Sequence, residues 1–409
     1  MGDIVKFNDN RIYYLLSIAF ITDYLQYLLP PLHYISFVCE IFIWIMMIPH
    51  FMKFNKNTFI FYIIVSYFIF LICRGLLFGN FYKYLIFDIH IYTAIVFLTF
   101  FNINFSNVKY YAQIPTLFAK LLIISIPAAL LTFYFFGSFN DIYARSLLNE
   151  SNSNLDEKMF LAPILIAPLI VPFISELKRG LKYVVIIATS LVLIYGILTA
   201  TRSLIIICTL SFLSLITFKK LFKKTTLIYL LLFTVIVIGL SYSKNKTISL
   251  ISDSIAYSTV RFEKDNDYTS GRDTELYGLF EEFNLSELIF GRGAGAEQKF
   301  GFWKYVFAAN EHGISFTHFG FLYLILKGGF ILLIIVYGLA LYSLVVLFRH
   351  GERKYFFVIL IYLAADLSHT QFINYFYVLF LWLSINMAIQ LSITNKKEKL
   401  KLIPSQLIH

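Results

Sequence analysis

Long apolar runs separated by short polar clusters make up most of this chain of 409 residues. An α-helix that crosses the hydrocarbon core of a bilayer needs about 20 mainly apolar residues. The runs of roughly that length are 11–29, 34–52, 58–78, 82–102, 114–136, 158–175, 181–199, 202–218, 225–242, 315–348, 354–370 and 371–390. The pattern predicts an all-α polytopic membrane protein of about twelve spans, with residues 1–409 in a single transmembrane domain.

The first and the tenth runs need a separate interpretation. The first run has the length of a span and no small-residue cleavage site, so we expect a transmembrane helix there and no cleaved signal peptide. The tenth run is too long for one straight span, and Gly328-Gly329 lies inside it. Because glycine weakens a helix, we expect a short helix that enters the membrane, followed by a full span.

The positive charges fix the predicted sidedness. Lys and Arg clusters follow the even-numbered runs at 53–56, 109, 178–182, 219–224, 349–354 and 396–401. Positive clusters stay on the cytoplasmic side, so both termini are predicted to be cytoplasmic. The long connections 137–157 and 243–314, which join spans 5 to 6 and 9 to 10, are then external.

Composition indicates a membrane protein and argues against a soluble or a nucleic-acid-binding protein. Hydrophobic residues make up 59% of the chain and charged residues 14%, against about 25% charged residues in soluble domains. The net charge of +10 lies in the clusters between runs, so we expect no nucleic-acid partner. The three cysteines, Cys39, Cys73 and Cys208, have neither metal-ligand nor disulfide spacing.

The 243–314 loop carries its own helical pattern. Leu276, Leu279, Phe280 and Phe283 recur at the spacing of an amphipathic helix, and the segment 270–273 just before them has the form of a capping box. The pattern predicts a long, partly helical external loop between spans 9 and 10.

Ionisable residues inside apolar runs mark candidate chemistry, because burying them in a membrane is costly. They are Asp23, Glu40, Arg74, Asp88, His90, Lys120, Arg202, Asp366 and His369. All except Lys120 fall in the outer half of their predicted spans, which indicates a polar cavity open to the outside. Arg74 and Asp366 are candidates for binding substrate there. Interfacial residues and structural ion pairs are the alternative interpretation.

Two arginines suit an anionic ligand. Arg202 lies in a tight external turn, and Arg272 lies in the first turn of the predicted loop helix. A guanidinium offers a planar fork of donors for phosphate or carboxylate. A helix N-terminus attracts anions and disfavours a cation, so Arg272 at that end makes sense if an anion binds there. Contact with lipid headgroups remains the alternative for Arg202.

The end of the loop adds further candidates. Gly291, Gly293 and Gly295 surround Arg292 and permit positive φ or close approach to a ligand. His312 and His318 close the loop, and a histidine can act as a general base near neutral pH. A flexible turn with a solvated arginine and structural histidines is the alternative.

The order of these motifs resembles the O-antigen polymerase and ligase superfamily of bacterial surface-polysaccharide assembly. It runs from Thr201-Arg202-Ser203 through Gly271-Arg272 and Phe290-Gly291-Arg292-Gly293 to His318, before a helix that reaches Gly328-Gly329. The resemblance covers roughly residues 195–350, and it extends to the predicted spans, the sidedness and the place of the long loop.

The resemblance implies a glycosyltransferase that needs no metal and no other cofactor. Its donor would be an undecaprenyl-diphosphate-linked glycan in the bacterial cytoplasmic (inner) membrane. Arg202 and Arg272 would bind the diphosphate, and His318 would assist the acceptor hydroxyl. Arg292 would be a further phosphate or sugar contact, with Gly291, Gly293 and His312 also facing substrate.

Three functions fit these features to different degrees. We favour a polymerase that joins repeat units of O-antigen or capsule, with a chain-length regulator as a candidate partner protein. An O-antigen ligase that transfers polymer to lipid A core is the near alternative. A flippase for lipid-linked oligosaccharides also has about twelve spans and buried charges, but we would expect two similar halves and short loops.

Overall fold

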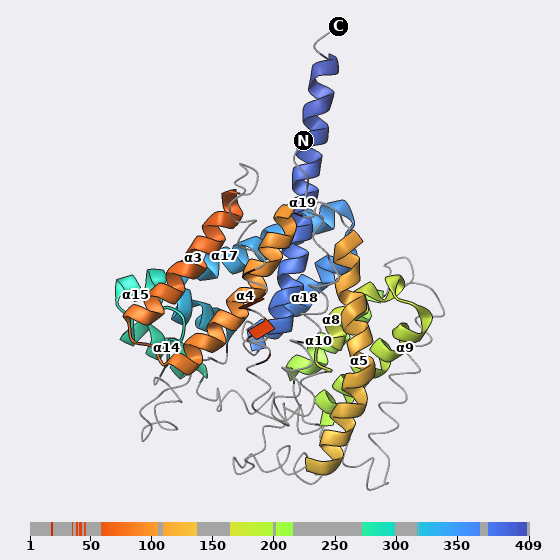
Figure 1. The fold of residues 1–409 in the computed structure, drawn as a ribbon, viewed down its shortest axis with the longest axis horizontal. Coiled ribbons are helices and arrows are strands. Elements are labelled where there is room, and N and C mark those ends of the chain that lie inside the picture. The colour runs from red at the N-terminus through yellow and green to blue at the C-terminus, as the bar shows by residue number, and fades with distance from the viewer. Residues whose placement is uncertain are drawn as a thin grey trace.

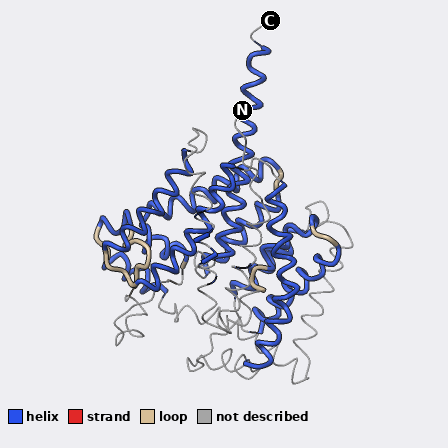
Figure 2. The backbone as a smooth tube through the Cα atoms, viewed as in Figure 1, coloured by secondary structure: helices blue, strands red, loops and turns tan. Residues whose placement is uncertain are grey.

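A computed structural model describes residues 59–104, 109–136, 164–198, 202–215, 272–298, 317, 319–368 and 375–406. It also describes isolated helical residues between 18 and 45, within the first two predicted runs. The predicted run 225–242 and the connection 137–157 lie outside the described residues. In the described part, helices are joined by loops and no β-strand occurs (Figure 2). This confirms the all-α prediction.

Most of the helices coincide with predicted runs. They are α3 (Phe59–Leu77), α4 (Tyr82–Asn104), α5 (Lys109–Phe136), α9 (Arg179–Leu198), α10 (Arg202–Leu215), α17 (Gly320–His350), α18 (Arg353–Ser368) and α19 (Tyr375–Gln406). Figure 1 shows them as one bundle, from which the C-terminal part of α19 projects. That helix continues past residue 390, the predicted end of the last run, through the lysines of the tail.

The run 158–175 does not form the continuous helix that was predicted. Its described part has a turn, a single helical turn α8 (Ala167–Ile170) and the 3-10 helix η3 (Val171–Glu176). Pro168 and Pro172 are the second residues of these two pieces. Proline lacks the backbone N–H that a continuing helix needs, so two prolines four residues apart explain the break.

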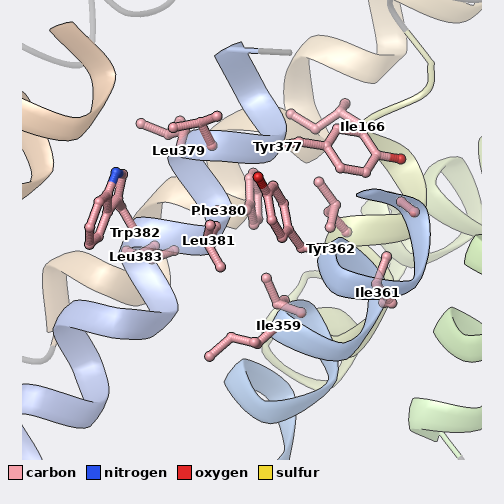
Figure 3. Close-up of a cluster of buried hydrophobic side chains, with 14 of the residues drawn as sticks. Ile166, Ile359, Ile361, Tyr362, Tyr377, Leu379, Phe380, Leu381, Trp382 and Leu383 are labelled. Atoms are coloured by element: carbon pink, nitrogen blue, oxygen red, sulfur yellow. The ribbon is translucent and has the colours of Figure 1, made fainter. Parts of the chain in front are cut away.

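The core of the bundle surrounds α19. Every side chain from Tyr377 to Met387 is buried, which is expected of a helix packed on all sides. Figure 3 shows this segment among residues of α18 and the turn before α8. The ring of Phe380 lies 5.7 Å from that of Phe118 and 6.2 Å from that of Phe173. Aromatic contacts therefore join α19 to α5 and η3.

Two short helices, α14 (Arg272–Glu282) and α15 (Leu285–Phe290), lie in the long loop. A helix is present where the spacing predicted one, and Leu279 and Phe283 are buried, but Phe280, predicted on the same apolar face, is 46% exposed. A capping box that the sequence analysis missed starts α15. The Asn284 side chain accepts from the Glu287 amide, and the Glu287 carboxylate accepts from the Asn284 amide. Both helices pack on α17.

α17 is interrupted where the sequence predicted it. Gly329 has φ +62° and ψ −166°, values outside the helical region. Its position is also crowded, because a Cβ there would lie 2.2 Å from the carbonyl oxygen of Ile289. The break divides a short first segment from a longer second one, as expected for the tenth run.

Two described helices could cross a membrane by length and composition, namely α9 over Arg179–Gly196 and α17 over Gly320–His350. Other described helices are apolar but shorter. Core helices of soluble proteins can have the same properties, so the count of twelve spans stays a prediction.

We expect Gly329→Ala to destabilise the protein. Alanine would be forced to a positive φ, at a cost of about 1–3 kcal/mol, and its Cβ would collide with the Ile289 carbonyl. Thermal unfolding of detergent-purified protein measures the effect. Gly338→Ala in the same helix is the control, because its nearest neighbour, Ile334 Cγ2, is 4.0 Å away. Equal melting temperatures for the two variants would contradict the break at Gly329.

Candidate functional site

The glycine loop, defined as residues 291–296, passes between α3, α4 and α17. Gly291, Gly293 and Gly295 have φ values of +70°, +86° and +75°, which confirms that positive φ is used here. A Cβ on Gly293 would lie 2.3 Å from the Gly75 nitrogen, and one on Gly291 would lie 2.3 Å from the Lys327 oxygen. The glycines therefore allow close approach to the protein's own backbone.

The break in α17 supplies acceptors for the loop. A helical carbonyl normally accepts from the amide four residues ahead. Around the break, the Leu326 oxygen accepts from the Arg292 amide and the Lys327 oxygen accepts from the Gly293 amide, both at 2.9 Å. The Tyr67 hydroxyl donates to the Gly328 oxygen at 2.6 Å. The glycine loop and α3 thus bond to the carbonyls beside Gly329.

Other backbone groups of the loop are also bonded within the protein. The Ala294 amide donates to the Leu71 oxygen of α3 at 2.9 Å, and the Ala296 amide donates to the Gly293 oxygen at 3.3 Å. Asn80 Nδ2 donates to the oxygens of Arg292 and Ala294, at 3.0 and 2.8 Å. Because the loop amides have protein acceptors, an anion at this position would be bound by side chains.

Asp88 of α4 and Lys327 of α17 form an ion pair at 2.7 Å, with both side chains fully buried. Asp88 Oδ1 accepts from the Tyr323 hydroxyl at 2.5 Å, and Oδ2 accepts from the Gly295 amide at 2.6 Å. Lys327 Nζ donates to the Ala296 oxygen at 2.8 Å. Breaking a buried pair by removing one partner typically costs about 3–5 kcal/mol, so these contacts are strongly coupled.

Arg292 is oriented by α14 and α15. Its Nε donates to Glu287 Oε1 at 3.0 Å, and its guanidinium lies 4.3 Å from the centre of the Phe283 ring. Nη2 lies 3.5 Å from the Glu282 oxygen, a marginal hydrogen bond. The side chain stays 24% exposed, so the guanidinium can reach a ligand.

Arg74 contacts the same loop from α3. Its Nε donates to the Gly291 oxygen at 2.7 Å. The guanidinium lies 4.8 Å from the centre of the Phe78 ring and 5.9 Å from that of Phe290. The structure therefore brings together Arg74, Arg292 and the loop glycines, which were predicted separately as substrate-binding residues.

Asp366 occupies a different place. It is buried, accepts from the Tyr337 hydroxyl at 2.7 Å, and lies directly against Gly320. A Cβ on Gly320 would be 1.9 Å from Asp366 Oδ2. About 12 Å of helix separates Gly320 from Gly328, at a rise of roughly 1.5 Å per residue. Asp366, a residue of α18, therefore contacts α17 on both sides of its break, at Gly320 before it and at Tyr337 after it.

The residues predicted as catalytic are described only in part. α10 begins at Arg202 and α14 begins at Arg272, and both arginines are described by their backbone alone. His312 and His318 lie outside the described residues. Asp265-Asn-Asp267, the one Asp-x-Asp sequence in the chain, also lies outside them. Among the described residues, no cluster of His, Cys, Asp and Glu could hold a metal ion.

Sequence reasoning missed Lys327, Tyr323 and Asn80. Lys327 is a lone lysine in the middle of an apolar run, immediately before Gly328-Gly329. The rule that singled out Asp88, the cost of an ionisable side chain inside a span, applies equally to Lys327. Asn80 and Tyr323 give no such signal, because both residue types are common near span ends.

No family model, no curated protein and no solved structure matches this sequence.

We expect Asn80→Asp to destabilise the protein more than Asn80→Ala. Alanine leaves two loop carbonyls without their donor, and an unsatisfied buried group costs about 1–3 kcal/mol. Aspartate also places carboxylate oxygens against those carbonyls. Thermal unfolding in detergent compares the two variants, with Thr209→Ala, at an exposed helical hydroxyl, as the control. A melting temperature for Asn80→Asp equal to that of the control would contradict the bridging role.

Proposed function

We propose that this chain is a bacterial inner-membrane protein of about twelve spans with both termini cytoplasmic, as the apolar runs and charge clusters predict. The outward-facing surface of α17 supports this proposal. Ile334, Leu341, Val345 and Phe348 are 50–74% exposed and recur on one face of the helix. Large exposed apolar surfaces mark sites of contact with membranes or other proteins, and lipid would cover this one.

Within that membrane, we propose that the protein polymerises undecaprenyl-diphosphate-linked repeat units into O-antigen or capsule on the external face. A hydroxyl of the acceptor glycan gives its proton to a base, for which His318 is the candidate, and attacks the anomeric carbon of the donor. The bond to the lipid diphosphate breaks, and the diphosphate leaves with the electron pair. The developing negative charge has to be neutralised, and arginines can do this without a metal.

The observation that carries the proposal is the position of the two arginines. Arg202 and Arg272 are the first residues of α10 and α14. The first turn of a helix has unpaired amide groups and a partial positive charge, both of which favour a bound anion. An arginine at this end adds a full charge where an anion is already favoured. Arg202 and Arg272 are our candidates for the diphosphate contacts.

The other predicted residues take supporting roles in this proposal. His318 assists the acceptor hydroxyl, and His312 contacts substrate nearby. Arg292 and Arg74, held on the glycine loop, provide further contacts for phosphate or sugar. Gly291 and Gly293 act by shaping the loop, because their amides donate to protein oxygens. Asp366 acts from α18, where it contacts Gly320 and Tyr337 of α17.

We expect Arg202→Ala and Arg272→Ala each to lower polymer synthesis about 100- to 1,000-fold, the usual cost of removing one contact to a developing oxyanion. Electrophoresis of surface polysaccharide measures the chain lengths, and immunoblotting of membranes measures protein levels. Arg179→Ala, at an exposed arginine of a predicted cytoplasmic cluster, is the matched control. Normal chain lengths in both variants at normal protein levels would refute the diphosphate role.

A deletion strain separates the polymerase from the ligase. Loss of a polymerase leaves single repeat units on lipid A core, because ligation still proceeds. Loss of a ligase leaves unsubstituted core, with polymer still on the lipid carrier. We expect single repeat units in the glycolipid analysed by mass spectrometry, and unsubstituted core with carrier-bound polymer would favour the ligase.

A further inference from the structure

The glycine loop has little means of holding itself in place. Residues 293–296 are Gly-Ala-Gly-Ala, whose side chains are a hydrogen or a methyl group. Glycine also loses more conformational freedom on ordering than any other residue. The loop must therefore be fixed by backbone hydrogen bonds to partners that other segments supply.

Asp88 and Lys327 are such partners, and their chemistry matches the polarity of the backbone. An ionised carboxylate only accepts hydrogen bonds, and it meets the Gly295 amide at 2.6 Å. A lysine ammonium only donates, and it meets the Ala296 oxygen at 2.8 Å. Each charge thus binds both its counter-ion and the loop group of the complementary kind.

Attraction between the two charges does not by itself explain why the carboxylate lies on α4 and the ammonium on α17. A buried ion pair can often be replaced by apolar residues without loss of stability, because removing both charges from water is costly. An ion pair would attract equally well with its two charges exchanged between α4 and α17. The loop contacts allow only one orientation, since exchange would place an ammonium against an amide and a carboxylate against a carbonyl.

We propose that Asp88 and Lys327 form a clasp that positions the glycine loop by matching the polarity of its backbone. The Tyr323 hydroxyl fixes the carboxylate of the clasp through Oδ1. Arg292 is part of the loop, and Arg74 donates to the Gly291 oxygen. The clasp thereby positions both guanidinium groups. Only the consequence for substrate rests on the proposed function.

Thiol labelling tests the clasp. The native cysteines are replaced by serine, and Ala296→Cys introduces a single thiol at a fully buried position. Maleimide is added to the detergent-purified protein, so that the loop is reached whichever side of the membrane it faces, and the labelling rate is normalised to the amount of protein. We expect slow labelling in this parent chain, because the loop is closed.

Asp88→Asn and Lys327→Met should each raise the labelling rate about tenfold or more, since either change leaves an unpaired buried charge that favours local opening. The exchange Asp88→Lys with Lys327→Asp should label as fast as the single variants. Asp88→Asn with Lys327→Gln should restore slow labelling, because two amides can supply a donor and an acceptor to the loop.

Lys354→Met, which breaks the partly exposed pair with Glu176, is the matched control and should leave labelling slow.

Slow labelling of the charge-exchanged variant would refute the clasp. It would show that the two charges act only by attracting α4 to α17, whichever helix carries which charge. Fast labelling of the Asn and Gln combination would also overturn it. If the single variants fail to accumulate, Tyr323→Phe tests the same contact by removing one hydroxyl, and unchanged labelling in it would refute the role of Asp88 Oδ1.

Polymer length in the same variants connects the clasp to the proposed function. Chains should be short or absent where labelling is fast and should return in the Asn and Gln combination. Fast labelling with normal polymer would contradict the positioning of Arg74 and Arg292 and leave the glycosyl transfer proposal standing. Conversely, normal polymer in both Arg202→Ala and Arg272→Ala would refute that proposal, while the labelling results would still decide the clasp.

Discussion

Asp88 and Lys327 are both out of contact with water, and each depends on partners that come from distant parts of the chain. The carboxylate is satisfied by Tyr323, Lys327 and the Gly295 amide, and the ammonium by Asp88 and the Ala296 oxygen. An ionised group in an apolar interior is tolerated only when it is paired and hydrogen-bonded. The pair therefore requires α4, α17 and the glycine loop to meet in one arrangement.

The break in α17 is a second feature that determines where the glycine loop lies. A continuous helix would use the Leu326 and Lys327 carbonyls internally, whereas here they accept from Arg292 and Gly293. The approach is close enough that glycine is needed on both sides: Gly329 faces Ile289, and the Lys327 oxygen lies against Gly291. The interruption of the helix and the path of the loop thus determine each other. Tyr67 bonds to the Gly328 oxygen and extends the junction to α3.

Local features of the sequence predicted much of the described fold. Apolar runs predicted helices such as α3, α4 and α18, and adjacent glycines predicted the break in α17. The spacing of Leu279 and Phe283 predicted the helix of the long loop. Each of these signals arises within a few turns of chain. Proline chemistry at 168 and 172 was also local, but the apolar content of the run 158–175 obscured it.

Contacts at the candidate site could not be predicted in the same way. The Gly295 amide meets a carboxylate 207 positions earlier, and the Tyr323 hydroxyl meets the same carboxylate from 235 positions later. Hydrophobic periodicity identifies which residues face a core, but it does not select partners between elements. The isolated charges of Asp88 and Lys327 were visible in the sequence. Their pairing, and the backbone groups they bind, emerge only from the packing of α4 against the loop and α17.

This packing also changes how an anion would be recognised. A glycine-rich loop with an arginine suggests a nest of backbone amides around a phosphate. Here the loop amides already donate to protein oxygens. Arg74 and Arg292 instead bind the protein through the same atom, since Nε donates to the Gly291 oxygen in one and to Glu287 in the other. An Nε contact fixes the plane of a guanidinium and leaves terminal nitrogens that can pair with phosphate oxygens, although Nη2 of Arg292 also lies 3.5 Å from the Glu282 oxygen. In the proposed function, the glycine loop would contribute to anion binding by holding the guanidinium groups of Arg74 and Arg292 in place.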